Sequence, residues 1–469
     1  MSGIESLPLV EVAARIRARE ISALEVLDAV IARAEAVNPR LNAFLRIDAD
    51  LARDAARLAD AELASGRVRG PLHGVPMAHK DMFYRAGVPS SCGSKIKGER
   101  PEDTTATALA RLDAAGAIQF GVLHMAEFAY SPTGHNAHFG HCRNPWDVER
   151  ITGGSSSGSG AAVATRATYA ALGSDTGGSI RLPAAFNGVT GLKVTYGRVS
   201  RAGAMPLSFS LDTVGPLART AADCALLLSV LAGHDPRDPT SSAEPVPDYV
   251  ARLSLPVRGL RVGVAMNFFT EDVEPGVGAA LTESLKALEA LGCEIVPVML
   301  PDLRPMDVAG AQVLAAEAAS LHGPWLRTRP EDYSAQVRAR LERGLALPAT
   351  KYIDALRYRG PALAAFSETV FAKVDVLHAP VAPIATPTLA DTDVGGSPNM
   401  DRTLGLLTRF TRPINFLGLP ALALPAGFLE SGLPVGMQLV GRPFAEDVLL
   451  RLGHAFQRAT DWHARAPSI

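Results

Sequence analysis

The sequence predicts an α/β protein, because stretches with helical periodicity alternate with short apolar runs that are typical of buried strands. Two glycine-rich turns interrupt this alternation: residues 153–160 are all glycine or serine, and a second Gly-Gly-Ser unit lies within 174–181. A helix-forming stretch over 161–167 and a small apolar run over 169–173 join the two turns. The chain has 469 residues, of which 47% are apolar and 20% charged, so it is long and apolar enough for a large core.

The first third of the chain contains one strong helix-start signal. Ser22 and Glu25 form a capping box that opens a helix over 26–36, and Asn38-Pro39 is expected to end that helix. The other elements expected here are paired helices within 5–47, a helix over 49–63, a helix capped by Asp103 or Thr104 and ending near Gly116, and a buried strand over 118–122.

The remaining two thirds continue the alternation of helices and strands. Two segments, 234–248 and 379–400, are rich in Pro, Asp, Ser and Thr and are expected to be surface excursions or boundaries. The expected strands cover 261–265, 294–300, 374–379, 422–428 and 435–440, and the expected helices cover about 275–292, 306–322, 334–345, 352–372 and 445–459.

Composition restricts the class of function. The formal net charge of −2 argues against a nucleic-acid backbone or an anionic membrane as the main partner. The four cysteines are far apart and form no Cys-x-x-Cys pair, which indicates a reduced, cytoplasmic protein. Charged residues interrupt the N-terminal segment, so no signal peptide is expected, and no run reaches the length of a membrane span.

The glycine-rich turns carry candidate chemistry. A Gly-Gly pair before Ser155 and before Ser179 leaves bare backbone N–H groups beside a hydroxyl, which is what a nucleophile with an oxyanion hole requires. A serine nucleophile also needs a base. Lys80 ends a short apolar run, and burial of a lysine lowers its pKa so that it can accept a proton near neutral pH.

These motifs together resemble the amidase signature family. The resemblance rests on Gly-Val-Pro-x-x-x-Lys-Asp over 74–81, on the Gly-Gly-Ser-Ser run and on Asp-x-Gly-Gly-Ser-Ile-Arg over 175–181, and it continues through 191–200, 210–216, 418–421 and 432–441. It implies the amidase-signature fold, in which a central mixed β-sheet is covered by helices on both faces. It further implies a single domain over 1–469, with 235–410 a variable peripheral or inserted region where the match is loose.

The resemblance also implies a Ser–cis-Ser–Lys catalytic triad. Ser179 would be the nucleophile, Ser155 the bridging serine after a cis peptide bond from Gly154, and Lys80 the base. Backbone N–H groups of the second turn would form the oxyanion hole, at Thr176, Gly177 and Gly178 as well as Ser179. Three further residues are expected to support the site: Ser156 beside Ser155 or Lys80, Asp175 holding the turn, and Arg181 either holding the turn or contacting an anionic substrate.

The substrate expected from the sequence is an apolar amide. Phe128, Tyr130 and Ser131 are candidate pocket residues, and Met205, Leu207 and Phe209 are further apolar candidates near the motifs. The favoured activity is hydrolysis of a linear aryl or alkyl amide, or of a carbamate as in urethanases, with esterase activity also possible for the same acyl-enzyme. The expected enzyme is cytoplasmic and free-standing, a possible homodimer, with a small-molecule substrate, no cofactor, and no nucleic-acid or membrane partner.

The alternative function is that of a partner-dependent A-type subunit in an amidotransferase that amidates transfer RNA. The Asn-Leu-x-Arg-Tyr-Asp-Gly stretch of those subunits has only a weak echo over 355–360, and on this ground the sequence favours the free-standing hydrolase.

Other motif matches are weaker. Gly154 to Gly158 fits the Gly-x-Ser-x-Gly elbow, but largely polar residues precede it where a buried strand is required. Ser94-x-x-Lys97 lacks the companion motifs of serine β-lactamases, and the glycine run lacks the lysine of a phosphate-binding loop. His135, His138 and His141 lie three apart, but no Glu or Cys follows at a zinc-site spacing, so no metal is expected.

Overall fold

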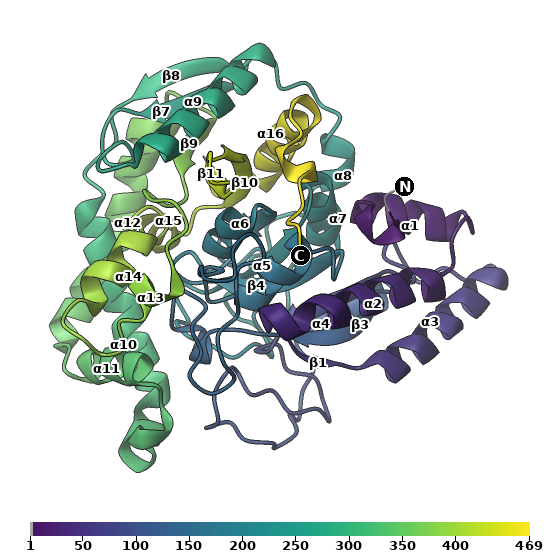
Figure 1. Cartoon of the computed structure of the whole chain (residues 1–469). Helices are drawn as coiled ribbons and strands as arrows, with labels where there is room; N and C mark the ends of the chain where they lie inside the picture. Colours follow the sequence, from purple (N-terminus) through teal and green to yellow (C-terminus); the bar gives the residue numbers. More distant parts are fainter. Residues whose placement is uncertain (1–2) are drawn as a thin grey trace.

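The computed structural model describes residues 3–469 and confirms the predicted α/β class with a central mixed sheet (Figure 1). Within this range eleven strands form one sheet in the order β1-β3-β2-β4-β6-β5-β10-β11-β9-β7-β8. The strands are β1 Phe44–Ile47, β2 Pro76–Lys80, β3 Ile118–Leu123, β4 Ala170–Asp175, β5 Thr190–Lys193, β6 Thr213–Ala218, β7 Arg261–Ala265, β8 Glu294–Val298, β9 Val376–Pro380, β10 Ala421–Phe428 and β11 Pro434–Gly441.

The sheet combines parallel and antiparallel pairs, with β1 antiparallel to β3 at one edge. β2 is parallel to its neighbours β3 and β4, and β7 is parallel to its neighbours β8 and β9. The pairs between these two groups are antiparallel: β4 with β6, β6 with β5, β5 with β10, β10 with β11, and β11 with β9. Every residue of β2, β4, β6 and β11 is buried. Since successive side chains of a strand point to opposite faces, both faces of the sheet are covered there.

Helices supply this cover (Figure 1). They are α1 Leu9–Arg17, α2 Ala23–Leu41, α3 Ala49–Ala64, α4 Thr107–Ala114, α5 Ser157–Ala164, α6 Arg181–Asn187, α7 Ala221–Leu231, α8 Tyr249–Arg252, α9 Pro275–Ala290, α10 Arg304–Thr328, α11 Ala335–Leu345, α12 Ala349–Phe366, α13 Leu389–Thr392, α14 Met400–Thr408, α15 Arg412–Leu417 and α16 Glu446–Ala459. Shorter helical turns are η1 Ile4–Ser6, η2 Glu127–Ala129, η3 Pro330–Asp332, η4 Ser367–Phe371 and η5 Trp462–Ala464.

Two predicted helix boundaries differ from the structure. The capping box of Ser22 is present, but α2 continues past Asn38-Pro39 to Leu41. The Asn38 side chain bonds the backbone of Phe44, which holds the last turn in place although Pro39 donates no hydrogen bond. The predicted cap at Asp103 or Thr104 is wrong, because α4 begins only at Thr107. The N–H of Ala106 donates to the Tyr84 carbonyl and that of Thr107 to the Ala202 carbonyl, so neither belongs to an earlier helical turn.

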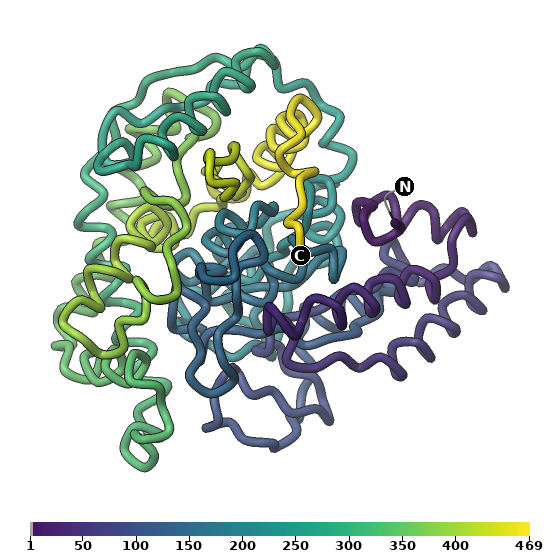
Figure 2. The backbone as a smooth tube through the Cα atoms, viewed as in Figure 1, coloured from purple at the N-terminus to yellow at the C-terminus, as the bar shows by residue number. Residues whose placement is uncertain are grey.

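The predicted loop over 379–400 contains the short helix α13 and leads into α14, and neither helix was expected from the sequence. Strands β7, β8 and β9 come from 235–410 and extend the same sheet beyond β11. Figure 2 shows the green part of the chain that includes α10, α11 and α14 along one side of the molecule, beside the blue glycine-rich segments. The division into a domain and a variable region stays a prediction.

Among residues 3–469, no helix combines the length and apolar character that crossing a membrane requires.

Candidate active site

The sheet brings the two predicted reactive segments to one edge. β2 and β4 are parallel neighbours, with Ala78 opposite Ala171 and His79 opposite Leu172. Parallel strands end at the same edge of a sheet. Lys80, the last residue of β2, therefore lies beside the end of β4, from which the second glycine-rich turn departs.

Lys80 is fully buried, and its amine contacts two serine hydroxyls. The Lys80 Nζ lies 2.8 Å from Ser155 Oγ and 2.9 Å from Ser174 Oγ. Burial lowers the pKa of Lys80 to about 7, although the carboxylates of Asp212 and Asp175 act to raise it. An amine with that pKa is largely neutral above pH 7 and can then accept a proton.

The first glycine-rich turn holds Ser155 against Lys80. The peptide bond from Gly154 to Ser155 is cis, as the resemblance implied. The next N–H, that of Ser156, donates to the Ser179 carbonyl at 3.3 Å, so the two turns are in direct contact. Ser179 is 8% exposed whereas Lys80 and Ser155 are fully buried, and its hydroxyl has no hydrogen-bond partner within residues 3–469.

The backbone of the second turn presents fewer N–H groups than the sequence suggested. The Gly178 N–H donates to Asp175 Oδ1 at 2.8 Å, so it is occupied rather than free for an oxyanion. Across the described chain, the N–H groups of Thr176, Gly177 and Ser179 make no hydrogen bond. A Cβ added to Gly177 would meet no atom within 4 Å, so this side of the turn faces open space.

A buried ion pair fixes the turn. Arg181 and Asp175 are both fully buried, and Arg181 Nε lies 3.1 Å from Asp175 Oδ2. Burial by itself raises the pKa of the Asp175 carboxyl, but the charge and hydrogen bonds of Arg181 hold that pKa well below its ordinary value. The remaining Arg181 donors bond Gln438 Oε1, Asn415 Oδ1 and the Thr411 carbonyl. With these partners Arg181 holds the turn and does not reach open space.

Several residues of this network were not singled out from the sequence. Ser174 is the second partner of Lys80, and Ser156 Oγ accepts a hydrogen bond from the Ser174 N–H at 3.3 Å. The Thr411 hydroxyl donates to the Gly177 carbonyl at 2.6 Å. Ser174 immediately precedes the Asp175 motif, and Gln438 lies inside a resembling block, so their positions in these blocks were the available signals.

A cavity of about 370 Å³ is lined by residues that are hydrogen-bonded neighbours of the two turns, although no described residue of either turn lines it. On one side it is lined by Tyr130 and Pro132, and the Pro132 carbonyl accepts the Gly154 N–H at 2.7 Å. On the other side it is lined by Thr408, whose carbonyl accepts the N–H of Thr411, the residue bonded to Gly177. The remaining lining residues are Asp307, Ala311, Ala315, Arg340, Arg343, Asp401, Leu404, Gly405 and Arg412.

This cavity differs from the predicted apolar pocket. Only Tyr130 of the three candidate pocket residues lines it. Phe128 is buried among other aromatic rings, with its centroid 5.7 Å from that of Trp325. The buried Ser131 hydroxyl bonds Thr133 at 2.9 Å and accepts from Gln336 Nε2 at 3.0 Å. Charged groups from α10, α11, α14 and α15 line much of this cavity, and which cavity receives the substrate stays a prediction.

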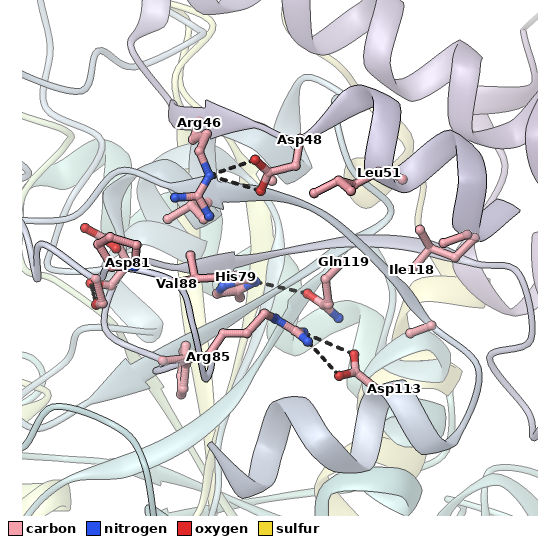
Figure 3. A pocket seen from close by; sticks show the side chains of 18 of the residues that line it. Arg46, Asp48, Leu51, His79, Asp81, Arg85, Val88, Asp113, Ile118 and Gln119 are labelled. Carbon is pink, nitrogen blue, oxygen red and sulfur yellow. Dashed lines mark hydrogen bonds and ion pairs between the residues drawn. The ribbon is translucent and has the colours of Figure 1, made fainter. Parts of the chain in front are cut away.

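Two other cavities flank the site. One of them, of about 280 Å³, lies around His79 and is shown in Figure 3. His79 and Lys80 are successive residues of β2, so their side chains point to opposite faces of the sheet. The charged walls of this cavity are internally paired, as the dashed lines between Arg46 and Asp48 and between Arg85 and Asp113 show. The other, of about 200 Å³, is lined by Ser174 and by the predicted apolar residues Met205 and Phe209.

The three histidines considered as metal ligands have separate hydrogen-bond partners. His135 pairs with Thr392, His138 Nε2 lies 2.7 Å from Glu127 Oε1, and His141 accepts the Asn136 N–H. Residues 3–469 contain no group of three or more His, Cys, Asp or Glu side chains placed to hold a metal ion.

Comparison with known proteins identifies relatives along the whole chain. The Amidase family model matches residues 25–450. A protein of Chloroflexus aurantiacus that is named as the A-type subunit of a glutamyl-tRNA(Gln) amidotransferase is 42% identical, with both chains covered completely. A solved structure described as a vestigial protein complex that reveals the origins of an s-triazine catabolic enzyme is 37% identical, with a TM-score of 0.90, covering 96% of this chain and 98% of that one. A bacterial aryl acylamidase is 26% identical, with a TM-score of 0.88 and coverage of 99% and 100%.

These relatives overturn one expectation from the sequence. A free-standing enzyme with only a small-molecule substrate and no nucleic-acid partner was predicted, chiefly because one short stretch near 355–360 lacks a subunit motif. The full-length relatives at 42% identity are named as one subunit of an enzyme of transfer RNA. Identity spread over the whole chain outweighs the absence of one local motif.

Replacing Arg181 with Met should destabilise the fold by about 3–5 kcal/mol, because it leaves the buried Asp175 carboxylate without its partner. Urea unfolding followed by circular dichroism measures the change. Arg338→Met is the matched control, since Arg338 pairs with Glu342 at the surface and should cost at most about 1 kcal/mol. Equal effects of the two substitutions would contradict the assigned role of Arg181.

Proposed function

Because the chain belongs to the amidase signature family, we propose that it cleaves a carboxamide through an acyl-enzyme on Ser179, as the amide-cleaving subunit of an amidotransferase-type complex. As a member of this family it is a hydrolase that acts on C–N amide bonds. The identity of the nucleophile, the base and the partners is our proposal.

One observation carries the proposed chemistry: the buried Lys80 amine lies 2.8 Å from the Ser155 hydroxyl, next to the turn that holds Ser179. A buried lysine without a carboxylate partner is costly as an ammonium ion, which favours its neutral form. A neutral amine in hydrogen-bond contact with a serine is suited to general-base catalysis.

In the first half-reaction Ser179 Oγ attacks the amide carbonyl carbon. The Ser179 proton passes to Ser155, and the Ser155 proton passes to neutral Lys80. The carbonyl oxygen becomes an oxyanion, which the unoccupied N–H groups of the Thr176–Ser179 turn can stabilise. The C–N bond then breaks, the Lys80 proton returns through Ser155 to the leaving nitrogen, and an ester on Ser179 remains.

In the second half-reaction water cleaves this ester. Lys80, neutral again, takes a proton from water through Ser155, and hydroxide adds to the acyl carbon. Collapse of the intermediate breaks the bond to Ser179 Oγ, which recovers its proton by the same path. The products are a carboxylic acid and ammonia or an amine, and the protein is unchanged.

The assignment to a complex rests on the relatives. Proteins named as A-type subunits of an amidotransferase match this chain from end to end at 42% identity, and the relative at a TM-score of 0.90 was solved as a protein complex. In the complex that we propose, the ammonia released by this chain is used by a partner subunit. This proposal replaces the free-standing enzyme expected from the sequence.

A second candidate is cleavage of an apolar aryl or alkyl amide, a carbamate or an ester by the same acyl-enzyme. The observation in its favour is the cavity with Met205 and Phe209 beside Ser174, together with the aryl acylamidase relative. Rates measured on a panel of primary carboxamides, anilides, carbamates and esters separate the two candidate functions. Only an enzyme of the second kind should cleave the anilides fastest.

Ser179 should be the residue that a fluorophosphonate labels, and Ser179→Ala should abolish ammonia release from primary carboxamides. The protein is purified from its native host together with the subunits that accompany it, and the labelled peptide is identified by mass spectrometry.

Addition of the co-purified subunits should raise the rate at which the isolated chain cleaves amides. Labelling of Ser155, Ser156 or Ser94 would show that the nucleophile is misassigned, and full activity without any partner would exclude the subunit role.

The pH dependence of kcat/KM should follow the deprotonation of the Lys80 amine. The pKa of Lys80 is lowered to about 7, so the amine is protonated and inactive at pH 5–6 and free to accept a proton above pH 7. Activity should therefore rise through about pH 7, and Lys80→Met should reduce it by about 100- to 10,000-fold.

Lys193→Met is the control for this profile, because Lys193 is equally buried with a pKa of about 7 but bonds only the carbonyls of Val194 and Leu419. The midpoint of the kcat/KM profile, at about pH 7, should be the same in Lys193→Met as in the wild type. If the rise of kcat/KM with pH survives in Lys80→Met, or disappears in Lys193→Met alone, the base is another group.

A further inference from the structure

A further cavity, of about 210 Å³, lies at the far ends of the two helices that follow the reactive turns. α5 begins two residues after Ser155 and ends at Ala164, and α6 begins two residues after Ser179 and is capped by Gly188. Ala164 and Gly188 line this cavity. Helices of 8 and 7 residues are about 12 and 10 Å long, so the cavity is separate from the candidate active site.

Segments from both ends of the chain line this cavity. Ser6 and Pro8 come from the N-terminal end, and residues 463–465 come from the C-terminal end. Figure 1 shows the two chain ends on the same side of the molecule, near α7. Arg166 links the two segments, because its terminal nitrogens donate to Ser6 Oγ at 2.7 Å and to the Ala464 carbonyl at 3.3 Å.

The described lining of this cavity is basic. It contains three guanidinium groups, those of Arg166, Arg219 and Arg465, and no carboxylate. Arg219 donates to two backbone carbonyls, and the Arg465 guanidinium carbon lies 4.7 Å from the centre of the Phe428 ring. Within residues 3–469 the partners of all three groups are thus neutral, and the three positive charges are not compensated by ion pairs.

Nearby acidic groups do not enter the cavity. The charges of Asp223 and Glu5 act on Arg219, but neither side chain lines the cavity. The Asp223 carboxylate accepts the N–H groups of Val10 and Thr220. Arg219 is 9% exposed, and its Nε is buried without an acceptor in the described chain. A buried donor without an acceptor is costly, and an anion held in the cavity would reduce that cost.

The helix ends around the cavity do not cancel its positive charge. The N-terminal ends of two helices and the C-terminal ends of two others meet there, at Pro8 of α1, Thr220 of α7, Ala164 of α5 and Gly188 of α6. The partial charges at such ends are about +0.5 and −0.5, so the four sum to roughly zero. The three guanidinium groups therefore determine the sign of a ligand, which is an anion.

We propose that this cavity binds a phosphate group, either as inorganic phosphate or as a small phosphate monoester. Guanidinium groups suit phosphate because its oxygens accept pairs of parallel N–H bonds, and a dianion matches several positive charges better than a monoanion does. The volume of about 210 Å³ is below the roughly 300–1,000 Å³ of pockets for drug-sized ligands, so the ligand is small. A bound phosphate would hold the N-terminal and C-terminal segments together through the three arginines.

Isothermal titration calorimetry at constant ionic strength tests this binding. The purified full chain, with the subunits that accompany it, is titrated with inorganic phosphate, glycerol 3-phosphate and acetate. The two phosphate compounds should bind saturably, with a Kd at least about 10-fold below that of acetate, and should raise the Tm with their concentration. The one of the two that binds more tightly identifies free phosphate or a monoester as the ligand.

Arg465→Gln is the most direct variant, because the Arg465 side chain is exposed and makes no hydrogen bond or ion pair within residues 3–469. It should raise the Kd for phosphate about 10- to 150-fold, the loss expected for hydrogen bonds to a charged group. Arg465→Lys keeps the charge and should retain part of the affinity. Arg458→Gln is the matched control, because Arg458 is also exposed, on α16, and does not line the cavity. This control should bind phosphate as the wild type does.

Three outcomes would overturn the inference: no saturable binding of phosphate by the wild type, an unchanged Kd in Arg465→Gln, or an equal rise of the Kd in Arg458→Gln. Circular dichroism verifies that each variant is folded. Because the readout is binding, this test does not depend on the proposed amide cleavage. Failure of phosphate binding leaves the proposed chemistry of Ser179 standing, and failure of that chemistry leaves the phosphate site standing.

Discussion

The burial of a single amine organises the candidate site. Lys80 lies at the end of a fully buried strand. Among residues 3–469, its nitrogen has no carboxylate within hydrogen-bond distance and bonds only the hydroxyls of Ser155 and Ser174. In this environment the charged form loses its hydration without gaining an ion pair, and the pKa falls to about 7. The proposed proton path from Ser179 through Ser155 depends on this neutral amine.

The fold holds this amine beside the second turn through contacts that are distant in sequence. Parallel pairing of β2 with β4, in which His79 is opposite Leu172, places Lys80 beside the last residues of β4, just before the turn. The Asp175 carboxylate then accepts from the backbone of Gly178, Ile180 and Arg181 and so determines the shape of the turn. Arg181 in turn joins this turn to Asn415 and Gln438 near the C-terminal end of the chain. The three blocks of motif sequence thus form one hydrogen-bonded unit.

Local sequence carried much of this arrangement. The Gly-Ser run, the Gly-Gly-Ser unit and the lysine at the end of an apolar run made Lys80, Ser155 and Ser179 candidates, and their catalytic roles stay a prediction. Strand β7 was predicted with its observed limits. What local sequence does not contain is the pairing of distant segments. The occupation of the Gly178 N–H by Asp175, the second contact of Lys80 with Ser174 and the charged lining from α11 and α14 all depend on tertiary packing. The charged groups of the cavity that Tyr130 lines come from helices more than 150 residues beyond Tyr130, which local sequence does not place there.

The proposed chemistry requires Lys80 to be a neutral amine at physiological pH, and titration of its side chain measures this directly. The chain contains few lysines, so NMR of lysine labelled with carbon-13 at Cε can follow each resonance with pH, and loss of one signal in Lys80→Met assigns it. The account predicts a midpoint at about 7 for Lys80 in the resting protein. A midpoint near the ordinary lysine value of about 10.4 would contradict it, because the amine would then be charged and unable to accept the serine proton.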